Sequence, residues 1–175
     1  MPPPAAATTA PFLPTDFRAA LGMFATGVTV VTARGGNGQL VGLTANSFNS
    51  VSLDPPLVLW SLSRRSAALA VFRAGTHYAI NVLAADQLAL AERFAARMPE
   101  RWAGVAWQPG PGGAPLIVGA AAQFECSNRS RYVEGDHVIF VGQVEHCAHR
   151  AGAAPLLFHG GRYYTEHPLH TRPKP

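Results

Sequence analysis

Three polar segments of the sequence carry side chains that could do chemistry. The first, from Thr44 to Phe48, reads Thr-Ala-Asn-Ser-Phe where a buried strand would normally carry branched apolar residues. Small hydroxyl and amide side chains let a flat ligand lie close to the backbone and form hydrogen bonds at its edge. A β-bulge without any ligand explains the same composition equally well. The residues alone leave both interpretations open.

The second segment, Ser-Leu-Ser-Arg-Arg-Ser from Ser61 to Ser66, follows an apolar run and precedes a predicted helix. Free N–H groups at a helix start, hydroxyl groups and an arginine fork together could bind a phosphate monoester. The alternative is a serine cap followed by two solvated arginines, which composition slightly favours.

The third segment, Gly135-Asp136-His137, is a predicted turn that delivers an imidazole to the start of a strand. This imidazole could form a hydrogen bond with the amide or ribose of a ligand, or it could be an ordinary residue at the edge of a turn. A second group of candidate ligands, His146-Cys147-Ala148-His149, lacks further ligands at a spacing suited to zinc, so no metal site is predicted.

Motifs for several other chemistries are absent. The glycines between Gly36 and Gly42 have the wrong spacing for a dinucleotide fingerprint, and a strand pattern follows where a helix is required. The nucleophile motif Gly-x-Ser-x-Gly does not occur. Because the only lysine is Lys174, near the C-terminus, a Walker loop or a Schiff base has no lysine in the body of the chain.

Hydrophobic periodicity and turn residues predict the elements that position these segments. The strands are short and joined by hairpin-type connections, with no regular alternation of strand and helix, which favours a mainly β, antiparallel barrel with a few short helices. Helices are expected at 16–24, 67–72 and 86–96, a loop at 102–115, and strands at 27–33, 40–44, 47–53, 57–62, 77–83, 116–118, 121–131, 137–145 and 156–164.

Composition limits the class of protein. The 175 residues, 48% of them hydrophobic, suit one domain at 15–165, with a disordered leader at 1–14 and a tail at 166–175. Only 14% are charged, which favours a homo-oligomer. The scattered arginines give no basic stripe for nucleic acid. No signal peptide or membrane span is recognised, and two isolated cysteines fit a reduced, cytoplasmic protein.

Taken in order from Phe17 to Tyr164, these segments resemble the flavin reductase family, whose fold is the FMN-binding split barrel. The resemblance depends on several short motifs at matching spacings. They are Phe24-Ala25-Thr26-Gly27-Val28, Val30-Val31-Thr32, Gly42-Leu43-Thr44-Ala45-Asn46-Ser47-Phe48, Ser52-Leu53-Asp54-Pro55-Pro56, Phe72, Asn81-Val82-Leu83, Phe94-Ala95, Gly135-Asp136-His137 and Gly160-Gly161-Arg162-Tyr163.

The resemblance implies a role for each candidate residue. The strand from Thr44 to Phe48 would line the isoalloxazine ring and ribityl chain, with Tyr163 near the cofactor cleft. His137 would lie on the nicotinamide side, as the residue closest to catalysis. The full set of expected flavin-binding residues is Thr44, Ala45, Asn46, Ser47 and Phe48 along the ring and ribityl chain, Ser61, Ser63, Arg65 and Ser66 at the ribityl phosphate, and Phe94 and Tyr163 nearby.

The implied activity is that of an NAD(P)H-dependent flavin reductase. Hydride would pass from NADH or NADPH to N5 of FMN or FAD, a step that needs no general acid or base, and this suits the lack of a convincing catalytic carboxylate. The resemblance further implies a homodimer that supplies reduced flavin to a partner monooxygenase. The alternatives are a reductase with tightly bound FMN that serves a corrinoid or ferric chelate, and a non-enzymatic flavin- or haem-binding module.

Overall fold

The computed structural model describes residues 11–167, which form twelve strands, three α-helices and one 3-10 helix. The helices are α1 (Pro14–Gly22), α2 (Leu69–Ala74), η1 (Ala85–Gln87) and α3 (Leu88–Ala95). The strands are β1 (Thr26–Gly27), β2 (Thr29–Arg34), β3 (Leu40–Ala45), β4 (Asn49–Leu53), β5 (Pro56–Ser63), β6 (His77–Val82), β7 (Trp107–Pro109), β8 (Pro115–Ile117), β9 (Ala122–Glu134), β10 (His137–His149), β11 (Leu157–His159) and β12 (Arg162–Tyr164).

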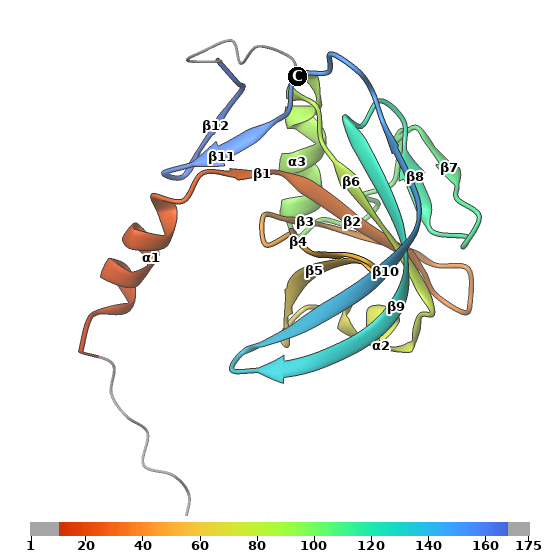
Figure 1. The fold of residues 1–175 in the computed structure, drawn as a ribbon, viewed down its shortest axis with the longest axis horizontal. Helices are drawn as coiled ribbons and strands as arrows, with labels where there is room; N and C mark the ends of the chain where they lie inside the picture. The colour runs from red at the N-terminus through yellow and green to blue at the C-terminus, as the bar shows by residue number, and fades with distance from the viewer. Residues whose placement is uncertain (1–10, 168–175) are drawn as a thin grey trace, which may run out of the picture.

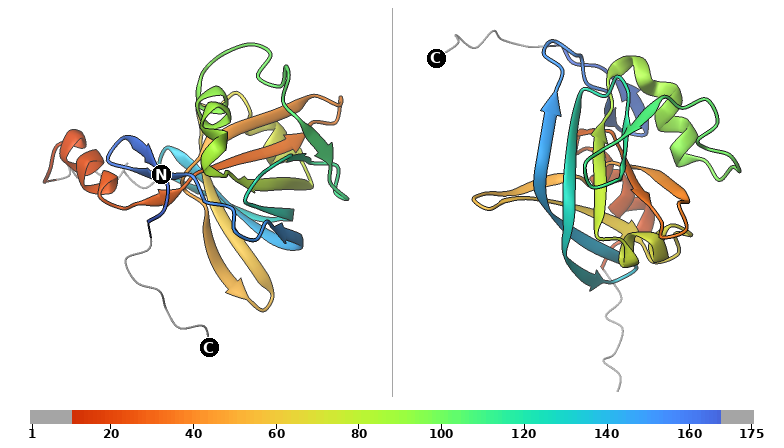
Figure 2. Two further views of the ribbon diagram at one scale, coloured as in Figure 1. Left: turned by 90° about the horizontal axis from the view of Figure 1, so that it is seen from above. Right: turned by 90° about the vertical axis from the view of Figure 1, so that its right-hand side faces the viewer.

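Seven antiparallel strands form the main sheet, in the order β3-β2-β6-β9-β10-β5-β4. Its two edge strands, β3 and β4, are consecutive in the chain and are joined by residues 46–48 alone. So short a link holds the edges close together, and the sheet must therefore curl round on itself (Figures 1 and 2). No ladder joins β3 to β4, which makes the barrel a split one and confirms the predicted fold class.

The barrel interior is filled by aromatic side chains that the strands present at alternate positions. Along β5, Val58, Trp60 and Leu62 are buried and their neighbours are not, which is the two-residue period of a half-buried strand. Trp60 stacks on Phe140 of β10, with ring centroids 4.9 Å apart. A second cluster, which includes Val30, Leu83 and Phe94, fills the space beneath α3.

Two elements project from the barrel. Helix α1 buries none of its residues, and Leu21 and the following Phe24 are 56% and 72% exposed. It extends away from the sheet, beside the three-stranded sheet β1-β11-β12 (Figure 1). The β4–β5 hairpin also projects (Figure 2), and Leu53 near its tip is 94% exposed.

Several expected element boundaries were wrong. The expected loop at 102–115 contains β7 and the start of β8, which form a separate two-stranded sheet. The expected last strand is a hairpin, β11 and β12, because Gly160 and Gly161 take left-handed φ angles of 55° and 79° and reverse the chain. Ser66 does not cap a helix; α2 begins later, with Ala68 in the cap position. Helix α1 begins and ends two residues earlier than expected.

The proposed domain limits stay a prediction. Residues 1–10 of the expected leader and 168–175 of the expected tail lie outside the described residues, and α1 begins at Pro14, the last residue of that leader. Among the helices at 11–167, none is long and apolar enough to cross a lipid bilayer. The cytoplasmic location also stays a prediction.

Candidate functional site

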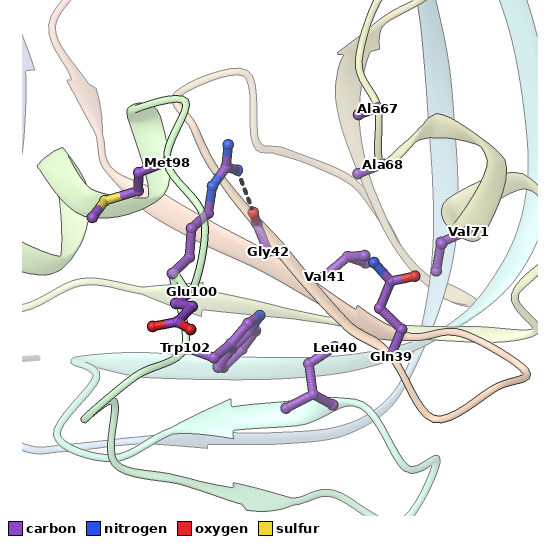
Figure 3. Close-up of a pocket in the computed structure, with 11 residues that line it drawn as sticks. Gln39, Leu40, Val41, Gly42, Ala67, Ala68, Val71, Met98, Glu100 and Trp102 are labelled. Atoms are coloured by element: carbon purple, nitrogen blue, oxygen red, sulfur yellow. Dashed lines mark hydrogen bonds between the residues drawn. The ribbon is translucent and has the colours of Figure 1, made fainter.

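A groove made of three adjoining hollows runs along the edge strand β3. The central hollow, about 660 Å³, is lined by residues of β3, the β5–α2 connection, α3 and the segment after it, among them Thr44, Arg65, Ser66, Phe94, Arg97 and Arg101. The tyrosine hollow, about 140 Å³, is lined by Val28, Thr44, Asn46, Ala95, Phe158 and Tyr163. The tryptophan hollow, about 410 Å³, includes Gln39, Leu40, Val41, Val71, Glu100 and Trp102 in its lining (Figure 3).

Shared residues make the three hollows continuous. Thr44 and Ala95 line both the central and the tyrosine hollow. Ala68 and Arg101, together with Ala67 and Met98, line both the central and the tryptophan hollow. The groove therefore follows β3 from Leu40 at one end to Asn46 just past the other.

Helix α3 forms one wall of the groove because two features of β3 hold it there. The Thr44 hydroxyl donates a hydrogen bond to the Ala91 carbonyl oxygen, 2.6 Å away. At Gly42, a Cβ atom would lie only 2.7 Å from the Phe94 ring, so glycine is what lets this helix approach the strand. Phe94 is buried and packs edge-on against Trp102, with centroids 5.0 Å apart.

Asn46 and Tyr163 both line the tyrosine hollow. Asn46 follows β3 and is exposed, so its amide can both donate and accept hydrogen bonds in the groove. The Tyr163 ring on β12 packs against Phe158, with centroids 5.3 Å apart. Burial, with a smaller contribution from the Glu92 carboxylate, raises the pKa of the Tyr163 phenol. The phenol therefore stays protonated near neutral pH and can donate a hydrogen bond.

The other residues of the Thr44–Phe48 segment are engaged within the protein. The Ser47 hydroxyl accepts a hydrogen bond from the Ser61 N–H (3.0 Å) and donates one to the Ser61 carbonyl oxygen (3.2 Å). Phe48 packs on Phe124 in the barrel core, with centroids 5.4 Å apart. Ala45 is buried, and its carbonyl accepts a hydrogen bond from Thr29. These four, Ser61 included, lie outside the linings of the three hollows, and their assignment to flavin stays a prediction.

The β5–α2 connection forms the opposite wall. The Ser63 hydroxyl accepts a hydrogen bond from the Arg65 N–H, and the Ser66 hydroxyl accepts one from the Ala68 N–H, both at 3.3 Å. These local bonds hold the connection in a turn before α2 begins. As a result, Arg65 and Ser66 line the central hollow, where phosphate binding was expected, while Ser63 lies behind them in the turn.

Two arginines of the groove were missed by the sequence analysis. Arg97 and Arg101 line the central hollow from the segment after α3. The Arg101 guanidinium donates a hydrogen bond to the Gly42 carbonyl oxygen, 3.2 Å away (Figure 3). With Arg65, these side chains make the central hollow cationic, because its lining contains no carboxylate. Arg97 and Arg101 belong to no recognisable sequence motif, so nothing in the sequence could have predicted that they lie in the groove.

His137 is the first residue of β10 and lies next to the β5–α2 connection. Its Cα partner on β5 is Ser63, and its Nδ1 lies 2.7 Å from Asp136 Oδ1. That hydrogen bond, followed by the charge of His137, lowers the pKa of Asp136. Gly135, with a left-handed φ of 57°, allows the tight turn that brings this pair next to β5.

A fourth hollow links this turn to the groove. It measures about 400 Å³ and is lined by Arg64, Arg65, Gly135 and Asp136. The Arg64 N–H and guanidinium donate hydrogen bonds to the carbonyl oxygens of Asp136 and Gly135, which ties the two loops together. Since Arg65 also lines the central hollow, the turn that carries His137 lies next to the groove.

The arrangement suits the binding of a small molecule. Within residues 11–167, no three side chains of His, Cys, Asp or Glu come together as a metal site would require. The groove offers an apolar lining, hydrogen-bonding groups along β3 and arginine side chains in its central hollow. A ligand with a flat ring and an anionic group matches those three properties.

Comparison with protein families decides what kind of protein has this groove. The model of the flavin reductase like domain matches residues 21–167. The chain belongs to the flavin reductase like family. This confirms the resemblance that the sequence motifs indicated, and it accounts for the split barrel.

Several members of the flavin reductase like family are similar to the chain over most of its length. The FMN reductase (NADH) SmoA of Agrobacterium fabrum is 49% identical over 148 residues, which cover 85% of this chain and 83% of that protein. HsaB of Rhodococcus jostii, the reductase subunit of a flavin-dependent monooxygenase, is 37% identical over 93% of this chain and 83% of its own length. A probable flavin reductase of Rhizobium meliloti is 43% identical, but the chain spans only 49% of it.

Solved structures of the flavin reductase like family have the same fold. The NADH:FAD oxidoreductase SgcE6 of Streptomyces globisporus, in complex with NAD and FAD fragments, superposes with a TM-score of 0.87 at 38% identity and covers 95% of this chain and 100% of its own. The styrene monooxygenase flavin reductase of Pseudomonas putida superposes with a TM-score of 0.81 at 34% identity and covers 89% of this chain and 99% of its own.

Proposed function

We propose that this chain is an NADH-dependent flavin reductase that supplies reduced flavin to a partner monooxygenase. The observation that carries the proposal is the continuous groove along β3, with Thr44 and Asn46 at its edge and Arg65 on its wall. The relatives support the activity, since SmoA is an FMN reductase that uses NADH and HsaB is a monooxygenase reductase subunit.

The residues of the groove fit a flavin. The central and tyrosine hollows, at about 660 and 140 Å³, are together of the size that small-molecule sites occupy. Phe94, which is packed under the groove, belongs to the apolar lining of the central hollow. The Thr44 hydroxyl gives its proton to Ala91, so towards the groove it can only accept a hydrogen bond. A flavin ring has N–H and carbonyl groups at its edge, and Thr44 and Asn46 can meet both kinds.

The anionic end of the flavin has its own partners. Arg65 and Ser66 reach the central hollow from one wall, and Arg97 and Arg101 from the other. A guanidinium binds a phosphate group through two parallel N–H bonds, and the cationic lining favours a dianion over a neutral ligand. We therefore assign the ribityl phosphate to Arg65 and Ser66, and the ring to the Thr44–Asn46 side with Tyr163.

His137 is assigned to the nicotinamide. Its hydrogen bond to Asp136 fixes the ring through Nδ1, which leaves Nε2 to bind a carboxamide or ribose group. The bound flavin supplies the chemistry, as the acceptor of a hydride from the nicotinamide. The part of the protein is to hold the two ligands in contact and to orient them.

The groove suits a flavin that binds and dissociates during the catalytic cycle. Asn46 and Arg65, at two points along it, are exposed side chains, and an exposed binding surface exchanges its ligand more readily than an enclosed cavity. This favours a flavin that is delivered to a partner over one held through many turnovers for another acceptor.

We further propose that the chain works as a homodimer. Helix α1 buries none of its residues, and Phe17, Leu21 and Phe24 on and just after it are all exposed. The projecting β4–β5 hairpin exposes Leu53 as well. A second copy, with the same two projecting elements, could cover these side chains through a symmetric interface.

The test is the oxidation of NADH by the purified protein, followed by the loss of the reduced-nicotinamide absorbance. We expect oxidation only when free flavin is added, with NADH preferred to NADPH. FMN, FAD and riboflavin are compared in turn. A rate no faster than that of a protein-free mixture with every flavin would overturn the proposal. Retention of the flavin through many turnovers and gel filtration would overturn the delivery role alone.

A further inference from the structure

We propose that a small hollow away from the groove binds a primary ammonium group, with Glu125 as its anionic partner. The hollow measures about 90 Å³ and is bounded by β8, β9 and β10. Its lining residues are Leu116, Gln123, Glu125, His146, Cys147 and Ala148. None of them lines the groove along β3, so this inference is independent of the proposed function.

Glu125 is the one charged residue among the buried residues at 11–167, with 6% of its surface exposed. The two ion pairs in this range are His77–Glu145 and Asp136–His137, so the Glu125 carboxylate has no cationic partner there. Withdrawing a carboxylate from water is unfavourable unless a cation or hydrogen bonds compensate for the lost hydration. A cation that enters the hollow is therefore stabilised more by this carboxylate than by an exposed one.

The turn between β7 and β8 holds the Glu125 carboxylate in place. The Gly112 N–H donates a hydrogen bond to Glu125 Oε2, 3.1 Å away. On the same turn, a Cβ atom at Gly110 would collide with the carboxylate, so glycine is what lets the turn lie against it. The bond to Gly112 uses one of about four acceptor positions on the carboxylate. The other positions remain for a donor in the hollow.

Two further acceptors line the hollow beside Glu125. Gln123 Nε2 donates hydrogen bonds to Asn81 Oδ1 (3.0 Å) and to the Ile117 carbonyl oxygen (2.8 Å), which uses both amide protons and leaves the amide oxygen as an acceptor. His146 lies directly opposite Glu125 in the β9–β10 ladder, so both side chains are on one face of the sheet. A neutral imidazole adds one acceptor nitrogen, and the three acceptors match the three N–H donors of a primary ammonium group.

The size and lining of the hollow favour a short organic cation. A volume of about 90 Å³ is that of about three water molecules, at about 30 Å³ each. Leu116 and Ala148 supply apolar contacts for a short alkyl stem. At 11–167, no three side chains of His, Cys, Asp or Glu are placed to hold a metal ion. The ligand is therefore a small primary amine or the end of a lysine side chain from another protein.

Cys147 reports on the hollow, because it is exposed and belongs to the lining while Cys126 is buried. Its rates of modification are measured with aminoethyl methanethiosulfonate, which carries a primary ammonium group, and with the neutral methyl reagent. Each rate is divided by that of N-acetylcysteine amide. We expect the ammonium reagent to be favoured about tenfold in the wild type and not at all in Glu125→Gln, as one charged hydrogen bond predicts. Glu134→Gln, an exposed carboxylate on the same strand, should retain the preference.

Competition in the wild type tests the site without any variant. Methylammonium should abolish the preference for the ammonium reagent, whereas tetramethylammonium at the same concentration, which has no N–H donor, should not. Competition by Nα-acetyl-lysine methylamide as well would extend the site to lysine side chains, and competition by methylammonium alone would assign it to small amines. Melting temperatures verify that Glu125→Gln and Glu134→Gln fold. The proposal is overturned by the lack of a preference in the wild type, by a preference that persists in folded Glu125→Gln, or by equal competition from both ammonium ions.

Discussion

Thr44 Oγ1 lies 2.6 Å from the carbonyl oxygen of Ala91 and donates its only proton to it. This bond ties the edge strand β3, which runs along the groove, to α3, which forms one of its walls. It also determines what the hydroxyl offers to a ligand, because its lone pairs remain as acceptors.

Thr44→Val keeps the shape of the side chain and removes the acceptor. We expect flavin dissociation constants to rise about tenfold, with a stability loss of about 1 kcal/mol from the lost bond to Ala91. Thr44→Ser, which retains the hydroxyl, should lie close to the wild type in both measurements. Fluorescence titration and denaturant unfolding provide the numbers. Wild-type affinity in Thr44→Val would remove this residue from the flavin site.

Ser66→Asp tests the phosphate assignment. A carboxylate beside the proposed phosphate position adds like-charge repulsion, which is worth about 1 kcal/mol or more at contact distance. FMN binding should therefore weaken about tenfold while riboflavin binding, which involves no phosphate, is spared. Ser66→Asn gives a neutral side chain of similar size as the control. Equal weakening for FMN and riboflavin would move the phosphate elsewhere in the groove.

His137→Ala tests the nicotinamide assignment. The imidazole is nearly half exposed and is fixed through Asp136. We expect NADH turnover, measured as kcat/KM, to fall about tenfold, as the loss of one binding hydrogen bond predicts, with little change in flavin affinity. His149→Ala, an exposed histidine at the other end of the same strand, should behave like the wild type. Equal effects on nicotinamide and flavin, or on neither, would contradict the assigned role.

Substitutions that add negative charge to the exposed apolar side chains of α1 test the proposed homodimer. Leu21→Glu combined with Phe24→Glu places two carboxylates on the exposed apolar side chains that we expect a second copy to cover. The mass in solution, measured by light scattering, should be that of a dimer for the wild type and of a monomer for the double variant. Arg18→Glu, on the same helix, controls for the added charge. A wild-type monomer would end the dimer proposal.

The two cysteines should differ in reactivity. Cys126 is fully buried, and burial, followed by the charges of Glu145 and Glu125, raises its pKa to about 12. The thiolate is the reactive form, so Cys126 stays inert at neutral pH. Cys147 is exposed. A thiol reagent should titrate one cysteine in the folded protein and two in urea, and none in folded Cys147→Ser. Rapid modification of Cys126 without unfolding would contradict the packing of the barrel.

Local patterns were sufficient to predict the seven strands of the main sheet and the fold class. The β-branched run of β2 and the Gly35–Gly38 turn indicated a hairpin that the structure contains. The hairpin of β11 and β12 was missed because two adjacent glycines within an apolar run permit either a bend or a reversal. That choice is made by contacts with β1, which is distant in sequence.

The site was only partly predictable, because several of its residues are placed by contacts between segments that are distant in sequence. Thr44 and Asn46 stand out because polar residues interrupt a strand pattern. The partnership of Ser47 with Ser61 depends on how the β3–β4 link packs against β5. Arg101 bonds to Gly42, where the absence of a Cβ lets Phe94 of α3 pack close to β3. Such positions follow from tertiary packing, which leaves no periodic signal in the sequence.

The link of residues 46–48 between β3 and β4 has one more consequence. It bridges the two open margins of a curled sheet, and Asn46 within it borders the proposed ring site. The length of this link consequently fixes the separation of β3 and β4. An inserted residue would let the two strands move apart and widen the proposed ring site, and a deleted residue would bring them closer together. This short link therefore sets a dimension of the proposed binding site.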